Sequence, residues 1–225
     1  MAVALIPPDD DRVPFPAVDS AAREPNGLLA VGGNLGPHRL LDAYRQGIFP
    51  WFGEGEPILW WSPDPRCVLF PERLHVSRSL RRTLNGGTIR VTRNADFPAV
   101  VQGCAEPRPG SPGTWIVPAM VEAYIELHRL GWATSFECWR GGELVGGIYG
   151  VHIGRVFFGE SMFSRVTDAS KVALVQTAAA DDIALIDCQL DSPHLARMGA
   201  EEIPRRRFAA LLAEHGATRR DQATG

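Results

Sequence analysis

The run ELVGGIYGVHIGRVFFGE, from Glu143 to Glu160, most restricts the folds open to this chain. Two apolar stretches flank a turn near His152 to Arg155, a pattern that predicts a β-hairpin. The strand TSFECWR precedes it, and a helix from Asp168, a strand that contains Asp187 and a helix from about Arg205 follow it. Consecutive strands followed by a helix, a strand and a helix predict an α+β fold with a mixed sheet.

The chain divides near the stretch WWSPDPR, where two X-Pro steps force extended or turn geometry. Residues 1–64 are rich in proline, glycine and tryptophan, with one clear helix in PHRLLDAYRQG, and we expect a small N-terminal α/β domain. Residues 65–225 form the second predicted domain. Its first part alternates the strands CVLF and TIRVTR with the helices SRSLRRTLN, FPAVVQGCA and PAMVEAYIELHRLG.

Composition excludes several classes of protein. The chain is 45% hydrophobic and 22% charged over 225 residues, as in ordinary globular proteins. No apolar run approaches the roughly 18 residues of a membrane span, and the N-terminus has no signal-peptide pattern, so we expect a soluble cytoplasmic protein. Four cysteines without a CxxC pair predict neither a disulfide framework nor a zinc site. Nucleotide-phosphate motifs are absent, which predicts that neither ATP nor NAD is bound.

Positive charge concentrates in one segment although the formal net charge of the whole chain is −3. Between residues 66 and 93, seven arginines face one acid, a local net charge of +6. Ser77 is a predicted N-cap, and Arg78, Arg81 and Arg82 share one face of the helix that follows. Three arginines without interleaved acids suit phosphate-backbone binding. A merely solvated helix face is the alternative, and the sequence does not separate the two.

Asp187 interrupts the apolar strand ALIDCQL. Because side chains alternate along a strand, Asp187 and Gln189 are predicted to share one face while Ile186 and Cys188 share the other. An acid on an apolar wall has a tunable pKa and can act as a base or orient an amine. The alternative is structural, with Asp187 capping a turn or pairing with an arginine.

Nine stretches, in this order, resemble the leucyl/phenylalanyl-tRNA-protein transferase family: NGLLAVGGNLGPHRLLDAYRQGIFPWF, PILWWSPDPR, HVSRSLRR, GTWI, LVGGIYGV, FFGESMFSR, DASKVAL, LIDCQ and HLARMGAEEIPRR. They extend from about residue 26 to residue 208, nearly the whole chain. The resemblance implies transfer of leucine, phenylalanine or methionine from charged tRNA to proteins that begin with arginine or lysine, which marks them for the bacterial N-degron protease. It also implies a C-terminal domain like that of the GCN5-related N-acetyltransferases.

The same resemblance implies roles for particular residues. Asp187 and Gln189 would be the catalytic pair, and Arg78, Arg81 and Arg82 would contact tRNA. The amino-acid pocket would be lined by Trp51, Trp115, Phe157, Glu160, Met162 and Ile186. Because aminoacyl-tRNA is already an activated ester, no cofactor or metal is expected. We expect a monomer that does not associate with membranes.

Two other functions fit parts of the pattern. The implied fold allows an acetyltransferase that uses acetyl-CoA, although no glycine-rich pyrophosphate loop is evident. The arginine helix alone would suffice for a non-catalytic tRNA-binding module, in which Asp187 is structural. A serine hydrolase centred on Ser161 is a minor alternative, because Phe163 stands where a nucleophile elbow has its second glycine.

Overall fold

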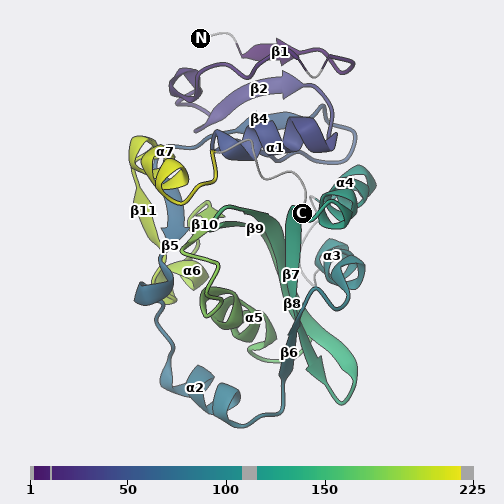
Figure 1. The fold of residues 1–225 in the computed structure, drawn as a ribbon, viewed down its shortest axis with the longest axis vertical. Coiled ribbons are helices and arrows are strands. Elements are labelled where there is room, and N and C mark those ends of the chain that lie inside the picture. The colour runs from purple at the N-terminus through teal and green to yellow at the C-terminus, as the bar shows by residue number, and fades with distance from the viewer. Residues whose placement is uncertain (1–2, 11, 108–115, 219–225) are drawn as a thin grey trace.

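The structure is a computed structural model that describes residues 3–10, 12–107 and 116–218. Those residues form two β-sheets flanked by helices (Figure 1). The smaller sheet has the strand order β1-β2-β4-β3 and belongs to the N-terminal segment. The larger has the order β11-β5-β10-β9-β8-β7-β6. The predicted α+β class with a mixed sheet is confirmed.

The N-terminal sheet is built from very short strands. β1 (Ala4–Ile6) runs parallel to β2 (Leu28–Gly32), which pairs antiparallel with β4 (Leu59–Trp61), and β4 pairs with β3 (Phe49–Pro50). A 3-10 turn (Val18–Ser20) and helix α1 (Pro37–Arg45) lie between these strands in the sequence. Only α1 was predicted individually, because strands of two to five residues leave too short a pattern to detect.

The large sheet is antiparallel except at one place. Its strands are β5 (Arg66–Leu69), β6 (Arg90–Arg93), β7 (Ala133–Arg140), β8 (Glu143–Ile153), β9 (Val156–Ser164), β10 (Leu185–Gln189) and β11 (Glu201–Ile203). Among the described residues, β9 and β10 are the only parallel pair of this sheet. Parallel neighbours need a crossover, which here contains helix α5 (Ala169–Ala178).

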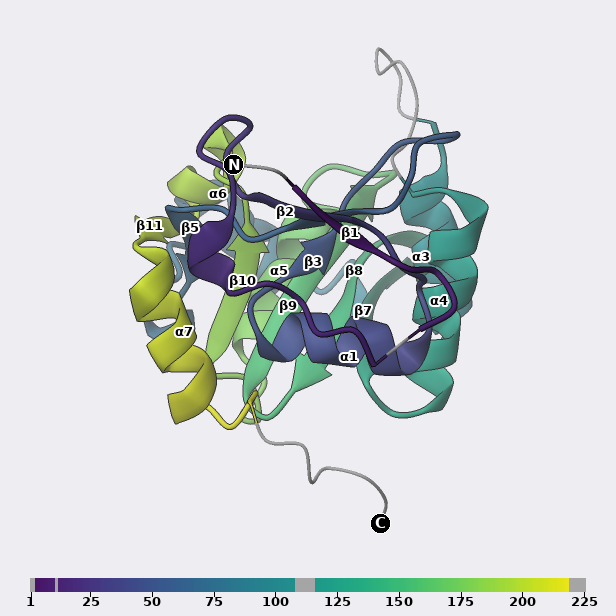
Figure 2. The same cartoon turned by 90° about the horizontal axis from the view of Figure 1, so that it is seen from above.

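Helices cover both faces of the large sheet. One face carries α3 (Phe97–Ala105) and α4 (Pro118–Arg129), with α1 and the N-terminal sheet stacked above them (Figure 2). The other face carries α5 and α2 (Arg78–Asn85). A 3-10 turn, Pro71–Arg73, precedes α2 in the sequence. Helices α6 (Pro193–Arg197) and α7 (Arg205–Glu214) lie at the β11 side (Figure 1). No helix within the described ranges is long and apolar enough to span a membrane.

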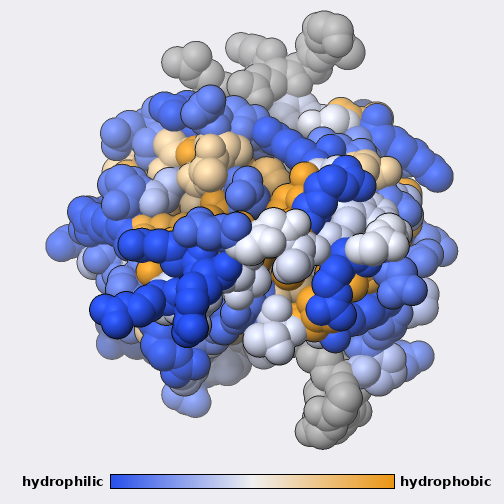
Figure 3. Space-filling view, turned by 90° about the horizontal axis from the view of Figure 1, so that it is seen from below, coloured by the Kyte–Doolittle hydropathy of each residue, from blue (hydrophilic) through white to orange (hydrophobic). Residues whose placement is uncertain are grey.

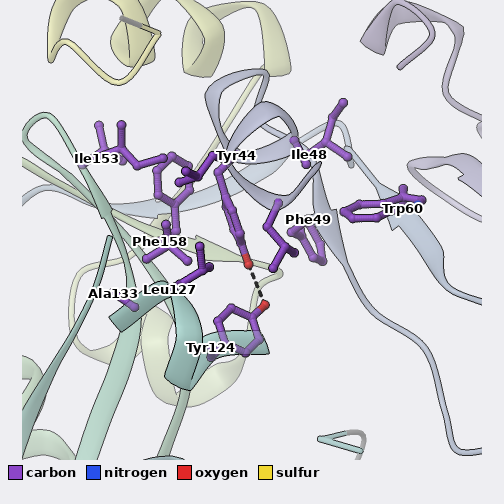
Figure 4. Packing of buried hydrophobic residues seen from close by; sticks show 14 of the residues in the cluster. Tyr44, Ile48, Phe49, Trp60, Tyr124, Leu127, Ala133, Ile153 and Phe158 are labelled. Carbon is purple, nitrogen blue, oxygen red and sulfur yellow. Dashed lines mark hydrogen bonds between the residues drawn. The ribbon is translucent and has the colours of Figure 1, made fainter. Parts of the chain in front are cut away.

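Two apolar clusters follow from this layering. The first joins the N-terminal segment to the sheet and packs Tyr44, Trp60, Tyr124 and Phe158 into one core (Figure 4). The second lies under α5 and α2 and contains Leu80, Phe157 and Ile186. Because the first cluster is continuous between the N-terminal sheet and the large sheet, a substantial apolar contact holds the two together. The division into domains 1–64 and 65–225 remains a prediction.

Most predicted elements of the second half occur where expected. The hairpin turns at Gly154, whose φ of 60° suits glycine in a tight turn. α5 begins directly after Asp168 and α7 begins at Arg205. Ser77 caps α2 by accepting a hydrogen bond from Leu80 N at 3.2 Å, as predicted. α6 and β11 are not among the predicted elements, because they are only five and three residues long.

Candidate active site

A β-bulge places Glu160 in the first core. In the β8–β9 ladder Tyr149 pairs with Ser161 but Gly150 pairs with Gly159, so Glu160 is the extra residue. Phe158 before the bulge and Phe163 after it therefore belong to the same core, although five positions separate them. Met162 is turned to the opposite side, into the second core. The bulge thus puts an acid and a methionine close together but on different walls.

A second irregularity shapes the end of β10. Asp187 pairs with Val68 and Gln189 with Cys67, so the ladder shifts register at Cys188. Gln189 adopts a left-handed backbone with φ of 63°, which is uncommon for a residue with a side chain. Its backbone N–H donates to Asp187 Oδ1 at 3.0 Å. Simple strand alternation, as the sequence analysis assumed, therefore stops at Cys188.

Asp187 is completely buried and paired with Arg66, whose side chain is 1% exposed. Arg66 Nε donates to Oδ1 at 2.8 Å and Nη2 donates to Oδ2 at 2.6 Å. The remaining guanidinium nitrogen, Nη1, donates to the carbonyl of Gly47 at 3.0 Å. Gly47 follows the end of α1 with φ of 74°, so the same guanidinium links the N-terminal segment to β10. The pairing with an arginine, the structural alternative for Asp187, is present.

Glu160 is buried among hydrogen-bond donors. Tyr44 Oη donates to its Oε1 at 2.7 Å, Tyr124 Oη lies 2.7 Å from Oε2, and Gln189 Nε2 donates to Oε1 at 2.9 Å. The two tyrosine oxygens are themselves 2.6 Å apart. The dashed line in Figure 4 marks this hydrogen bond. Burial raises the pKa of Glu160 to about 7, against the lowering effect of the tyrosine hydroxyls.

Glu160, Asp187 and Gln189 border a small cavity of about 140 Å³. Its apolar wall comes from Ile148, Met162, Leu174, Ile186 and Leu195, and its polar side from Glu160, Ser161, Asp187 and Gln189 together with Gly159 and Cys188. The cavity lies against β9 and β10, the parallel pair, beneath α5 and α6. An apolar hollow with a few convergent polar groups is the usual form of a small-molecule site.

Five of the eight predicted catalytic and pocket residues border this one cavity: Asp187, Gln189, Glu160, Met162 and Ile186. Phe157 does not border it but packs beneath, fully buried and paired in register with Ile186. Trp51 lies apart from it, 41% exposed, with its ring against Trp61 at 5.8 Å. Trp115 falls outside the described residues.

The predicted tRNA-contacting residues lie on another part of the molecule. Arg78, Arg81 and Arg82 are all exposed on α2, at the end opposite the N-terminal sheet (Figure 1). Figure 3 shows that end, where strongly hydrophilic side chains surround apolar patches. Within the described chain no ion pair involves these three arginines. Other arginines of the basic segment are neutralised, Arg73 by Glu201 and Arg93 by Asp182, so the local +6 overstates the free charge.

Sequence reasoning missed three residues of the site: Arg66, Tyr44 and Tyr124. Arg66 was counted as part of the basic segment, and both tyrosines lie within predicted helices. One signal was available, because the chain has only three tyrosines. All three are fully buried, and the rings of Tyr124 and Tyr149 lie 5.4 Å apart.

The arrangement suits proton movement beside an apolar side chain. The Asp187 charge is neutralised by Arg66, whereas no cation pairs with Glu160 among the described residues. Glu160 therefore titrates near neutral pH, as a group that exchanges protons should. No set of three potential metal ligands comes together in the described part of the chain.

Two family models match the chain. The leucyl/phenylalanyl-tRNA protein transferase N-terminal domain matches residues 33–64, and the leucyl/phenylalanyl-tRNA protein transferase model matches residues 68–213. A leucyl/phenylalanyl-tRNA–protein transferase of Methylococcus capsulatus is 55% identical over 219 residues, covering 96% of this chain and 93% of the relative. Another, from Anaeromyxobacter sp., is 59% identical over 216 residues, covering 94% and 90%.

Solved structures align more distantly. A GCN5-related N-acetyltransferase from Kribbella flavida aligns with a TM-score of 0.36 and 13% identity, over 74% of this chain and 60% of that chain. A conserved protein of unknown function from Bacteroides thetaiotaomicron aligns with a TM-score of 0.44 and 11% identity, over 66% and 55%. The sequence matches carry the assignment: this chain belongs to the leucyl/phenylalanyl-tRNA protein transferase family.

Proposed function

We propose that this chain transfers leucine or phenylalanine, and also methionine, from charged tRNA to the α-amino group of proteins that begin with arginine or lysine. The product carries a new N-terminal residue that marks it for proteolysis. The reaction exchanges an activated ester for an amide. We place it in the cytoplasm, where charged tRNA is made, and expect the protein to act as a monomer. Family membership over nearly the full length supports the activity.

The cavity between β9, β10 and α5 carries this proposal. Its apolar wall of branched side chains and Met162 would receive the side chain of the transferred amino acid. A flexible thioether adapts to both leucine and phenylalanine, whereas a polar side chain would lose its hydration there. Glu160 and Gln189 on the polar side would meet the amino and carbonyl groups.

Asp187 acts in this proposal as a positioning residue. Both of its oxygens accept hydrogen bonds from Arg66, and Oδ1 also accepts from Gln189 N, which leaves little capacity to take a proton from substrate. Asp187 holds the backbone of Gln189 in its left-handed conformation. From there the side-chain amide of Gln189 donates a hydrogen bond to Glu160. Gln189 would then orient the attacking amine toward the ester carbonyl.

The tRNA would be held mostly by its phosphates. The three exposed arginines of α2 can each contact a phosphate without reading a base. A second hollow, of about 690 Å³, shares Met162 with the cavity and is bordered by Ser164, Arg165, Ser170 and His194. Its position next to the cavity suits the 3′ end of the tRNA that delivers the amino acid.

The test is transfer of labelled phenylalanine or leucine from charged tRNA to a peptide that begins with arginine, against one that begins with alanine. We expect only the arginine peptide to be labelled. Asp187→Asn should be strongly impaired while still binding tRNA, with thermal unfolding measured to show that it remains folded. No transfer by wild type would leave the tRNA-binding module as the better account. Full activity in Asp187→Asn would remove only the role of Asp187.

A further inference from the structure

Three oxygen-bearing groups form a closed triangle in the first core. Tyr44 Oη lies 2.7 Å from Glu160 Oε1, Tyr124 Oη lies 2.7 Å from Oε2, and the two hydroxyl oxygens are 2.6 Å apart. The two tyrosine side chains are fully buried and Glu160 is 6% exposed. All three separations lie in the range of O–H···O hydrogen bonds.

The number of hydrogens available to these three contacts indicates whether Glu160 is ionised or protonated. Each tyrosine hydroxyl has one hydrogen to donate. If Glu160 is a carboxylate, both hydroxyls donate to it, and the short contact between the two hydroxyl oxygens has no hydrogen. If Glu160 is protonated, Oε2–H donates to Tyr124, Tyr124 donates to Tyr44, and Tyr44 donates to Oε1. Three contacts then have three hydrogens, and Oε1 also accepts from Gln189.

We infer that Glu160 is protonated at rest within a closed ring of hydrogen bonds with Tyr44 and Tyr124, and that this ring shares one proton with an amine bound in the adjacent cavity. The inference rests on the proposed function, because the amine is the α-amino group of the acceptor. Two arrangements hold the same proton: an ammonium beside ionised Glu160, and a neutral amine beside the closed ring. Burial, which disfavours a charged carboxylate, favours the second arrangement, in which the amine is a nucleophile and every contact of the ring has a hydrogen.

Burial and a neighbouring negative charge favour the protonated form of Glu160, against the hydrogen bonds that Tyr124, Tyr44 and Gln189 make to its carboxylate. Asp187, on β10, is the other buried acid nearby, and its charge opposes ionisation of Glu160. Arg66, on β5, directs two of its nitrogens to Asp187 and the third to Gly47. Tyr149, on β8, contributes a buried hydroxyl that has no hydrogen-bond partner within the described part of the chain.

Proton sharing also requires matched acidities. Burial raises the pKa of Glu160 to about 7, and an α-amino group has a pKa of roughly 8. The two values lie close enough for a proton to pass between the groups without a large barrier. An ordinary exposed glutamate, with a pKa of roughly 4, would not hold the proton. Glu160 borders the cavity, so an amine there can reach it.

The pH dependence of kcat/KM for the acceptor peptide tests the inference. In the reactive complex Glu160 and the amine together hold one proton. The value of kcat/KM therefore rises with pH up to about pH 7 and falls about tenfold for each pH unit above about 8. In Glu160→Gln only the amine must be deprotonated, so kcat/KM levels off above about pH 8 and does not fall. Initial rates are corrected for spontaneous hydrolysis of the aminoacyl ester.

Two tyrosine variants and a matched control separate the ring from mere packing. Tyr44→Phe and Tyr124→Phe remove a donor to the carboxylate and raise the pKa of Glu160, so the rising part of the profile moves to higher pH. Tyr149→Phe removes an equally buried hydroxyl that makes no hydrogen bond among the described residues, although its aromatic ring packs against Tyr124 at 5.4 Å, and we expect it to leave the profile of wild type. A shift of the same size in Tyr149→Phe would overturn the inference.

Infrared difference spectra of wild type against Glu160→Gln give a readout that needs no transfer. We expect the absorption of a protonated carboxyl below about pH 7, lost as the pH rises. An active wild type without this absorption, or with a profile that is level above about pH 8, overturns the inference but leaves the proposed function standing. Absence of transfer with the absorption present overturns the proposed function alone.

Discussion

The Arg66 guanidinium holds both carboxylate oxygens of Asp187, at 2.8 and 2.6 Å, with neither side chain more than 1% exposed. The guanidinium also lies between two aromatic rings, with its carbon 4.7 Å from the centroids of both Phe49 and Phe208. These contacts join β3, β5, β10 and α7 around one ion pair. Removing one partner of such a pair leaves an uncompensated buried charge.

Arg66→Met should therefore lower the free energy of unfolding by about 3–5 kcal/mol. The matched control is Arg73→Met, because Arg73 pairs with Glu201 at 2.8 Å but is 52% exposed. That pair should contribute no more than about 1 kcal/mol. Denaturant titration of both variants measures the difference. If both variants lost the same small amount of unfolding free energy, burial of the Arg66–Asp187 pair would not be what makes it stabilising.

Stability should fall as the pH rises through the titration of Glu160. Its pKa is raised to about 7 when folded, so between about pH 4.5 and pH 7 the folded state holds a proton that the unfolded state has lost. The contribution is present below the unfolded pKa and is lost as pH approaches the folded one. Over that window wild type should lose on the order of 3 kcal/mol relative to Glu160→Gln. Unfolding free energies at several pH values measure this, and a constant difference would contradict it.

The sequence predicted most of the large elements because their patterns are local. The β8–β9 hairpin, α2 with its Ser77 cap and α5 all depend on neighbouring residues. The partner of Asp187 could not be predicted in this way, since Arg66 lies 121 positions earlier and meets it only through antiparallel pairing of β5 with β10.

The same limit applies to Glu160. Its motif was visible, but the two hydroxyls that surround it come from separate helices, and the bulge that turns it inward leaves no mark in a single sequence. The role of Trp51 stays a prediction. An aromatic ring in a glycine- and proline-rich segment indicated a pocket, and the ring lies 41% exposed against Trp61, outside the lining of the cavity.

Replacing Arg78, Arg81 and Arg82 together with glutamine should weaken tRNA binding uniformly and reduce its salt dependence. Each lost phosphate contact lowers the slope of log K against log salt by about 0.9, or about 0.7 for single strands. Because all three side chains are exposed, folding should be unaffected. Arg129→Gln, on α4 and 72% exposed, is the control. An unchanged slope in the triple variant would mean that α2 is only a solvated face.

Leu174→Phe should change the preference between donor amino acids. Leu174 is 1% exposed and lies in the apolar wall of the cavity, so a larger ring there reduces the space left for substrate. Transfer of phenylalanine should fall more than transfer of leucine. The ratio of the two rates within one preparation corrects for any loss of folded protein. An unchanged ratio would place the amino-acid pocket elsewhere.

The single extra residue in β9 has a consequence for insertions and deletions. Deleting Glu160, the extra residue, would restore regular pairing with β8, and the later side chains would keep their faces because Ser161 already pairs with Tyr149. Inserting one residue directly after Ser161 would instead shift the register by one, turn Met162 away from the cavity and take Phe163 out of the core that it shares with Phe158. The number of residues in this strand is therefore as much a part of the site as their identity. Changes in length should be tolerated in the surface turns but not here.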